Sequence, residues 1–196
     1  MAVAVSADGR RVAAGGGIAG GKGAVHAWDA ATGAAQWSAD DCAKEVLALA
    51  FSPDGASLAA AAPDGVVTVR DAATGSVARS LPDHRGGATA VTFSPDGNAL
   101  YCGEAHGGTR VWDLRTGRLL RTIEVPRPTA QGFTVDRLMN SVALSGDGAT
   151  LAACASSVND EFVGAVRIWD ARTGKLRRDF SPDAEREPIV EPCQDR

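Results

Sequence analysis

The sequence predicts an all-β protein made of four tandem units, each with four short antiparallel strands. Two short turn motifs alternate strictly, four times each, along the 196 residues. The segments between the motifs are short apolar or alternating runs, which are typical of strands, and no segment keeps helical periodicity for more than a turn or two. With 44% hydrophobic residues and 23 glycines, the chain can bury a core and close many tight turns.

The first motif is an apolar strand followed by Ser-x-Asp-Gly. In the form Ser-Pro-Asp-Gly, proline fixes φ at the second turn position and glycine takes the positive φ that closes a hairpin. The motif therefore predicts a hairpin between the first and second strands of each unit. Its four copies are VAVSADG, LAFSPDG, VTFSPDG and VALSGDG, which end at Gly9, Gly55, Gly97 and Gly148.

The second motif is Asp-x-x-Thr-Gly, and it begins at Asp29, Asp71, Asp113 and Asp170. The aspartate can accept hydrogen bonds from the amides that follow it, while glycine fills the left-handed position of a bulged hairpin. The first three copies are 42 residues apart and the fourth follows after 57, so the last unit carries an insertion of 15 residues. A period of about 40–45 residues is typical of a four-stranded β-propeller blade.

The second unit shows the predicted strands most clearly, at residues 46–51, 57–61, 66–70 and 76–81. Applied to the whole chain, the pattern places blades at about 1–39, 44–82, 88–124 and 138–180. Residues 181–196 are charged and contain prolines, so we expect a disordered tail there.

These motifs resemble those of WD-repeat β-propellers over residues 1–180. The resemblance is carried by the Ser-Pro-Asp-Gly turns and by three Trp-Asp pairs, whose tryptophans are Trp28, Trp112 and Trp169. Members of that family bury a hydrogen-bonded set that includes a histidine before the first strand. Only the third unit has this histidine, His84; Cys42 takes its place in the second unit, where Arg70 also replaces the tryptophan.

The resemblance implies a protein-binding scaffold of the WD-repeat type without catalytic activity. Its interaction face is formed by the loops from second to third strands and from fourth strands to the next unit. In this chain the face would include Lys44, Glu45, His84, Arg85, Glu104, His106, Arg137, Asp160 and Glu161. Within this set we expect His84 to be structural, His106 to be an exposed loop residue, and the last two acids to lie in a solvated insertion.

Residues 27–37, AWDAATGAAQW, also resemble the docking motif of quinoprotein propellers, which are dehydrogenases with a quinone cofactor. This match occurs once, and the acids of a cofactor or calcium site cannot be placed. We therefore favour a hairpin with Trp37 packed between blades, and predict no catalytic residue, cofactor or metal. The run GGGIAG at 15–20 precedes a strand and not a helix, so it predicts a hairpin loop and not a dinucleotide site.

Composition narrows the functional classes further. The formal net charge of −4 disfavours a nucleic-acid binder, which would need a concentrated basic face. No apolar run reaches the ~20 residues of a membrane span, and the N-terminus lacks the basic start and apolar stretch of a secretory signal. We therefore predict a cytoplasmic protein whose partners are other proteins.

Four blades are few for a propeller, and three arrangements are open. The chain could be part of a longer propeller, it could pair with a second copy as two half-rings of an eight-blade ring, or it could close as a ring of four. We favour them in that order. An open array would leave apolar blade faces uncovered at each end.

Overall fold

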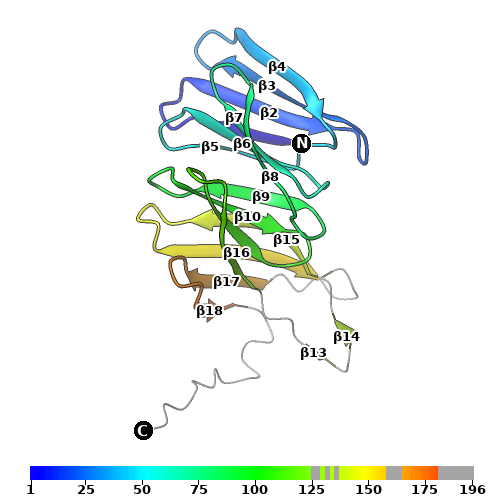
Figure 1. Ribbon diagram of the computed structural model, residues 1–196, viewed down its shortest axis with the longest axis vertical. Helices are drawn as coiled ribbons and strands as arrows, with labels where there is room; N and C mark the ends of the chain where they lie inside the picture. Colours follow the sequence, from blue (N-terminus) through cyan, green and yellow to red (C-terminus); the bar gives the residue numbers. More distant parts are fainter. Residues whose placement is uncertain (125–128, 131–132, 135–136, 158–164, 181–196) are drawn as a thin grey trace.

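The computed structural model describes residues 1–124, 129–130, 133–134, 137–157 and 165–180. Within these residues all regular secondary structure is β, in four four-stranded antiparallel sheets and one two-stranded sheet (Figure 1). The prediction of an all-β protein made of four-stranded blades is therefore confirmed. The part of the chain described here contains no helix long and apolar enough to cross a membrane.

Each blade is a simple meander in which consecutive strands pair. The first blade contains β1 (Ala2–Val5), β2 (Arg11–Gly17), β3 (Gly23–Asp29) and β4 (Ala35–Cys42). The second contains β5 (Ala48–Phe51), β6 (Ser57–Ala61), β7 (Val67–Asp71) and β8 (Val77–Leu81). The third contains β9 (Ala88–Phe93), β10 (Ala99–Glu104), β11 (Thr109–Asp113) and β12 (Leu119–Ile123). The two-stranded sheet, β13 (Thr129–Ala130) with β14 (Phe133–Thr134), precedes the fourth blade, which contains β15 (Arg137–Leu144), β16 (Thr150–Ser157), β17 (Ala165–Asp170) and β18 (Leu176–Asp179). The predicted tail, 181–196, lies outside the described residues.

The Ser-x-Asp-Gly turns close the first hairpin of each blade through one local network. In the second blade, the Ser52 hydroxyl donates to Asp54 at 2.5 Å and accepts from the Ser57 amide at 2.9 Å. Asp54 also accepts from the Ala56 amide at 3.0 Å, and Gly55 has the positive φ of +69° that the motif predicts. The serine–aspartate bond recurs in the other three blades.

The Asp-x-x-Thr-Gly turns close the last hairpin of each blade. Asp71 accepts from the amides of Ala73 and Thr74 at 3.0 and 2.8 Å, and from the Thr74 hydroxyl at 2.9 Å. Gly75 has φ +76°, and the pairing of β7 with β8 shifts register after Val69. These turns are thus bulged hairpins, and their aspartates are occupied by turn closure.

The hydrogen bonds of the turn carboxylates predict that the stability of the fold decreases over a defined range of acidic pH. Hydrogen bonds from Ser94 and then Asn98 lower the pKa of Asp96 from 3.8 to about 2. Because this folded-state pKa is depressed, the stabilisation is complete above about pH 4 and is lost as pH falls toward 2. We expect Asp96→Asn to lower the melting temperature at pH 7 and to converge on the wild type near pH 2. Circular-dichroism melts across this range test it, and a constant difference between the two proteins would contradict it.

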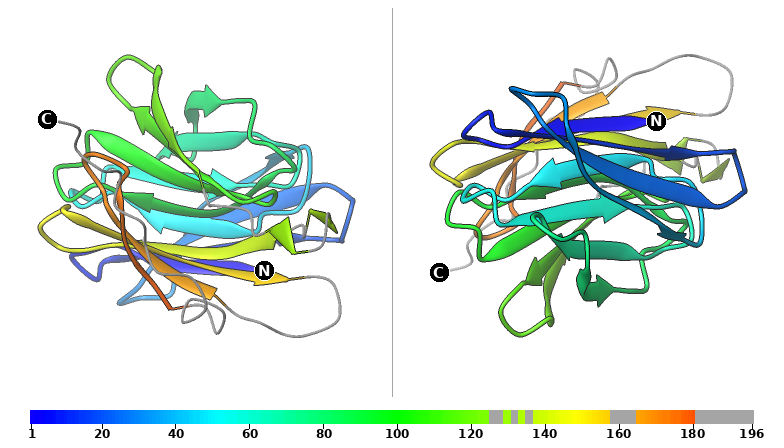
Figure 2. Two further views of the ribbon diagram at one scale, coloured as in Figure 1. Left: turned by 90° about the horizontal axis from the view of Figure 1, so that it is seen from below. Right: turned by 90° about the horizontal axis from the view of Figure 1, so that it is seen from above.

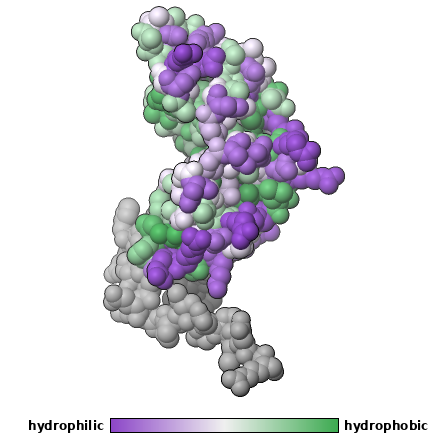
Figure 3. Space-filling model, turned by 90° about the vertical axis from the view of Figure 1, so that its left-hand side faces the viewer, coloured by the Kyte–Doolittle hydropathy of each residue, from purple (hydrophilic) through white to green (hydrophobic). Residues whose placement is uncertain are grey.

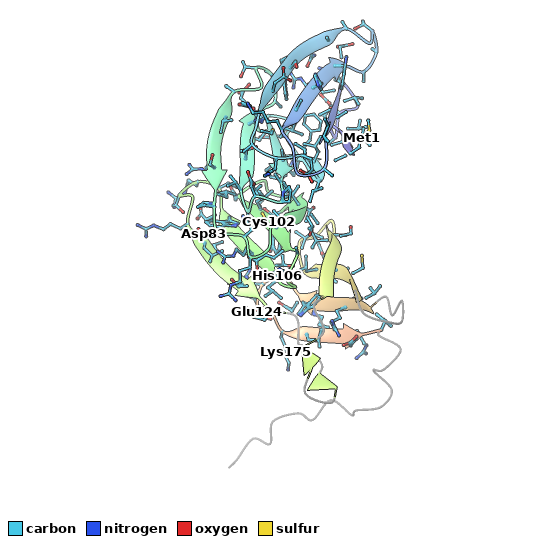
Figure 4. The ribbon with its side chains drawn as sticks, turned by 90° about the vertical axis from the view of Figure 1, so that its right-hand side faces the viewer. Met1, Asp83, Cys102, His106, Glu124 and Lys175 are labelled. Atoms are coloured by element: carbon cyan, nitrogen blue, oxygen red, sulfur yellow. The ribbon has the colours of Figure 1, made fainter. Side chains whose placement is uncertain are left out.

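The four blades stack face to face in chain order along an arc (Figures 1 and 4), and they overlap when viewed along the stack (Figure 2). Each junction between blades contains its own apolar cluster. One leucine from the second strand is fully buried at each junction: Leu58, Leu100 and Leu151 are 0% exposed. Small residues of the preceding blade, such as Ala13 and Ala59, face these leucines and allow the sheets to approach closely. The described sheets form an open array and not a closed ring of four.

Candidate functional site

The loops predicted to form the interaction face do lie together at one end of the array, on the right in Figure 1. They comprise residues 18–22, 43–47, 62–66, 82–87 and 105–108, and we call this end the loop face. Hydrogen bonds link successive loops: the His84 amide donates to Gly65 O at 3.1 Å, and the Ala105 amide donates to Gly87 O at 2.9 Å. The opposite end carries both turn motifs, and we call it the turn end; its surface has hydrophilic groups interspersed with hydrophobic ones (Figure 3).

His84 lies beneath the loop face and not on it. Its side chain is almost fully buried, its Nδ1 lies 3.0 Å from Gly65 O, and its Nε2 lies 3.1 Å from Trp112 Nε1. The indole N–H can only donate, so His84 Nε2 must be the unprotonated acceptor. The ring proton is therefore on Nδ1, which donates a hydrogen bond to Gly65 O. Burial lowers the pKa of His84, and this favours the neutral ring that the two bonds require. The expected structural role of His84 agrees with this geometry.

Glu104 is also buried, at 3% exposure, although it was included among the predicted face residues. Its carboxylate accepts from Arg110 Nε at 2.7 Å and from the Arg85 amide at 2.8 Å. The second bond fixes the backbone of the 82–87 loop, so Glu104 supports the loop face from below. The buried charge is compensated by Arg110, whose side chain is itself mostly covered.

The exposed residues of the loop face come from neighbouring loops. The side chains of Asp83, Arg85 and His106 are exposed, and Figure 4 shows Asp83 and His106 on loops of adjoining blades. Lys44 and Glu45 are half-buried and hold the hairpin at residues 17–22: Lys44 Nζ donates to Gly20 O at 2.6 Å, and Glu45 accepts from the Gly20 amide at 3.0 Å. Arg137 begins β15, but its side chain lies outside the described residues, as do Asp160 and Glu161 altogether.

Sequence reasoning missed an ion pair between the first two blades, in which Arg70 is buried and Asp41 is exposed. Arg70 is 1% exposed, and its guanidinium contacts Asp41 at 2.5 Å, Gly75 O at 2.9 Å and Cys42 Sγ at 3.6 Å. The hydrogen bond from Arg70 lowers the pKa of Asp41, and burial raises the pKa of the Cys42 thiol. Arg70 and Cys42 occupy the positions that Trp112 and His84 hold one blade later, so one donor–acceptor pair has replaced another. The signal that could have revealed this pair was that the second unit replaces both the tryptophan and the histidine at once.

Trp37 connects the first blade to the second, as the sequence predicted. Its ring lies against Gly75, where an added Cβ would come within 2.6 Å of it, and its Nε1 donates to Ala72 O at 3.0 Å. The same position in the next two blades holds arginines that make equivalent contacts. Arg79 Nη2 donates to Arg115 O at 3.4 Å, and Arg121 Nη2 donates to Ala171 O at 2.8 Å. We call this the docking position, because each of these three side chains reaches the Asp-x-x-Thr-Gly turn of the next blade.

The arginines at the docking position of the next two blades predict that Trp37 can be replaced by arginine with little loss of stability. We expect Trp37→Ala to lower the free energy of unfolding by about 1–2 kcal/mol, since it removes both the partly buried ring and the bond to Ala72 O. We expect Trp37→Arg to cost less than half as much, because arginine makes the equivalent contacts in the next two blades. Urea unfolding of both variants measures this. Equal losses in the two variants would show that the guanidinium cannot replace the indole here.

The described residues contain no group of three or more His, Cys, Asp or Glu side chains placed to hold a metal ion. Cys102 is fully buried and burial raises the pKa of its thiol, so the reactive thiolate is suppressed. The remaining candidate groups at the loop face are fixed in structural bonds or exposed to solvent.

Comparisons with known proteins give one family assignment. Residues 2–190 match the family model PQQ_2, described as outer membrane protein assembly factor BamB. A comparison with curated proteins gave no match. The matched span includes all four blades, which agrees with the predicted propeller repeats. The family model, however, describes a different propeller-repeat family from the WD repeats that the motifs resemble.

Proposed function

Because the chain belongs to the β-propeller repeat family described as outer membrane protein assembly factor BamB, we propose that it is a non-catalytic scaffold that binds other proteins through its loop face. One observation carries the proposal. Buried Glu104 and His84 fix the 82–87 loop from below, while the Arg85 and His106 side chains remain exposed above it. A rigid framework that presents exposed loop side chains is suited to recognition.

The family description names an assembly factor, but the family model itself, PQQ_2, fits a quinoprotein-like propeller better than a WD-repeat scaffold. The exposed residues of the described loops carry both signs of charge: Lys22 and Arg85 are basic, and Asp83 is acidic. A protein surface with interspersed charges of both signs would complement such a face. The WD-type scaffold and the cytoplasmic location predicted from the sequence stay predictions.

The experiment compares two matched double variants of the full chain. Lys22→Glu with Arg85→Glu reverses two exposed charges on the loop face, and Arg10→Glu with Arg118→Glu reverses two exposed charges at the turn end. Each protein is immobilised, exposed to extract from its source cells, and its bound proteins are quantified by mass spectrometry. We expect the amount of each partner bound by the loop-face variant to be at least tenfold lower than the amount bound by the wild type. The turn-end variant should bind as much as the wild type.

Melting temperatures of both variants provide the control for folding. The proposal fails if the loop-face variant, folded as stably as the wild type, keeps every partner. It also fails if the turn-end variant loses the same partners to the same extent, because the loop face would then have no special role.

A quinone-dependent propeller is the second candidate, and the seating of Trp37 on Gly75 favours it, since this is the contact expected of the quinoprotein docking motif. The described residues do not fit the cofactor itself: they lack a cluster of acids or histidines for an accompanying metal, and the motif's own residues are occupied between blades. Titration with pyrroloquinoline quinone and Ca²⁺, followed by cofactor absorbance and fluorescence, tests this candidate. Stoichiometric binding would support it, and unchanged spectra would exclude it.

A further inference from the structure

The outer edges of the third and fourth blades carry a concentration of positive charge that the first two blades lack. The comparison uses the nine residues that begin with the aspartate of each Asp-x-x-Thr-Gly turn: 29–37, 71–79, 113–121 and 170–178. Each segment contains one acid, the turn aspartate, while its Arg and Lys residues number none, one, three and four in chain order. The formal charge of the segment is therefore −1, 0, +2 and +3 in the four blades. Because the whole chain has a charge of −4, this edge has the opposite sign to the rest of the protein.

The fold of the turn does not require these basic residues. In every blade the turn aspartate accepts from the amide of the threonine that follows it, and no basic side chain takes part. At the second and fifth positions after the aspartate, the first two blades have alanine or serine. The third and fourth blades have four basic residues there, which we call the basic rim: Arg115, Arg118, Arg172 and Lys175. Among the described residues, no side-chain hydrogen bond or ion pair holds any of these four.

The basic rim is exposed, and a further blade would not cover it. The third blade has a neighbour on both sides, yet Arg115 and Arg118 are exposed. Arg172 and Lys175 occupy the same two positions in the fourth blade and are exposed as well. They would therefore stay exposed beside a following blade. Arg178 differs, because it is at the docking position, and it is not counted in the rim.

The two basic turns adjoin each other. Arg121 of β12 donates to Ala171 O at 2.8 Å and also to Arg172 O, both in the turn of the fourth blade. An added Cβ at Gly174 of that turn would lie 3.4 Å from the Ile123 side chain at the end of β12. The four basic side chains are thus presented by two turns in direct contact, which makes them one surface.

Exposed apolar side chains accompany the basic rim. Leu119 and Leu120 of β12, which directly follow Arg118, are 40% and 54% exposed. Val77, at the position of Leu119 in the second blade, is 43% exposed. The turn end likewise shows hydrophobic residues beside hydrophilic ones in Figure 3. Cationic groups beside exposed aliphatic groups suit the interface of an anionic bilayer, which offers phosphates and an apolar boundary at the same depth.

Nucleic acid fits this surface less well than a bilayer does. Proteins that bind single strands stack the bases on aromatic side chains, and residues 113–123 and 170–179 contain no aromatic residue. A duplex is held through its phosphates, which would engage the arginines but leave Leu119 and Leu120 without a role.

We propose that the basic rim, together with Leu119 and Leu120, binds the surface of anionic phospholipid bilayers. The four cationic side chains contact lipid phosphates, and the two leucines enter the interface between the phosphates and the acyl chains. This inference goes beyond the proposed function, because it concerns the outer edge at the turn end and leaves the loop face free for a protein partner. A test with the purified full chain and pure lipid is independent of any such partner.

The test measures sedimentation with vesicles of phosphatidylcholine containing about one third phosphatidylglycerol, in about 0.1 M salt, where charges act over about 10 Å. We expect binding to these vesicles, no binding to pure phosphatidylcholine, and loss of binding as salt is raised. The rim variant, Arg115→Glu with Arg172→Glu, reverses two of the four charges. Since each basic residue near an anionic bilayer contributes about 1 kcal/mol, or about fivefold in affinity, this variant should bind more weakly by about tenfold or more.

Two further variants separate the rim from net charge and from simple polyanion binding. Arg10→Glu with Ala31→Glu and Ala73→Glu gives the chain the same net charge as the rim variant, and two of its glutamates are at the equivalent positions of the first two blades. It should bind within about threefold of the wild type, because its charges lie away from the rim. Leu119→Ser with Leu120→Ser keeps every charge and should bind about fivefold more weakly, because it removes apolar groups from the interface.

Circular dichroism confirms that each variant is folded. The proposal is overturned if the wild type does not bind the anionic vesicles or binds neutral ones equally, if the folded rim variant binds like the wild type, or if the net-charge control loses as much affinity as the rim variant. It is also overturned if the leucine variant binds like the wild type, or if duplex DNA or polyglutamate at equal charge concentration displaces the chain from the vesicles. Either result would show a surface that accepts any polyanion.

Discussion

Replacing Asp41 by alanine is expected to lower the free energy of unfolding by about 2–3 kcal/mol, because it leaves the Arg70 guanidinium buried without a counter-charge. Removing one partner of a fully buried ion pair typically costs about 3–5 kcal/mol. The Asp41 side chain is 55% exposed, so water can partly replace it and the expected loss is smaller. Arg70 already has one buried nitrogen, Nε, without a hydrogen-bond partner, and this limits its capacity to tolerate a further loss.

Three comparisons test this prediction by urea unfolding. Asp40→Ala removes the neighbouring exposed carboxylate and should change stability by less than about 0.5 kcal/mol. Arg70→Met removes the buried charge, and we expect it to be neutral or stabilising, since apolar side chains often replace buried ion pairs without loss. The double variant Asp41→Ala with Arg70→Met should recover most of the stability lost in the single one. If Asp41→Ala is no worse than Asp40→Ala, the ion pair does not stabilise the junction.

The blades were predictable because their turns are determined locally. In Ser52–Ser57 and Asp71–Ser76, every bond that closes the turn joins residues no more than five positions apart. The motif and its hydrogen bonds are therefore contained in the same short segment. The predicted strand at 57–61 is identical to β6, and the one at 66–70 differs from β7 (Val67–Asp71) by one residue at each end.

The junctions between blades were less predictable, because they join residues that lie far apart in the chain. The docking position contains tryptophan once and arginine in the later blades, so a search for a tryptophan motif finds only the first copy. Trp37 and Arg121 share no side-chain chemistry except a planar group with N–H donors, yet both donate to the next blade. Their equivalence depends on counting from the turn aspartate and not on residue type.

The same limit explains why the interaction face was predicted as a region but not residue by residue. Glu104 and His84 are polar residues in or beside loops, which sequence alone associates with exposure. His84 is buried between Gly65 and Trp112, which come together only when the second and third blades pack, and Glu104 is paired with Arg110 of the neighbouring strand in its own blade. Arg85 and His106 follow the simple expectation because their side chains take no part in that network.

The pair of His84 and Trp112 carries the second large predicted effect. Replacing His84 by alanine leaves the buried Trp112 N–H without a partner, while the Gly65 carbonyl keeps its bond from the backbone amide of residue 84. An unsatisfied buried donor costs about 1–3 kcal/mol, so we expect a loss of about 2 kcal/mol at pH 7.5, where the ring is neutral. His106→Ala, which removes an exposed imidazole from the adjoining loop of the third blade, should cost less than about 0.5 kcal/mol.

The pH dependence distinguishes this network from a simple loss of volume. Burial lowers the pKa of His84 in the folded state. Near pH 6.5 and below, the histidine therefore binds a proton more readily in the unfolded chain than in the folded chain. The contribution of His84 is therefore complete above about pH 6.5 and decreases as pH falls below it; a protonated ring also cannot accept from Trp112. The stability difference between wild type and His84→Ala should shrink between about pH 7 and pH 5, while His106→Ala should follow the wild type. This window lies above that of the turn aspartates, so one set of urea titrations from pH 7.5 to pH 5 isolates the histidine. A difference that stays constant over this range would mean that His84 acts by filling space and that its bond to Trp112 adds no stability.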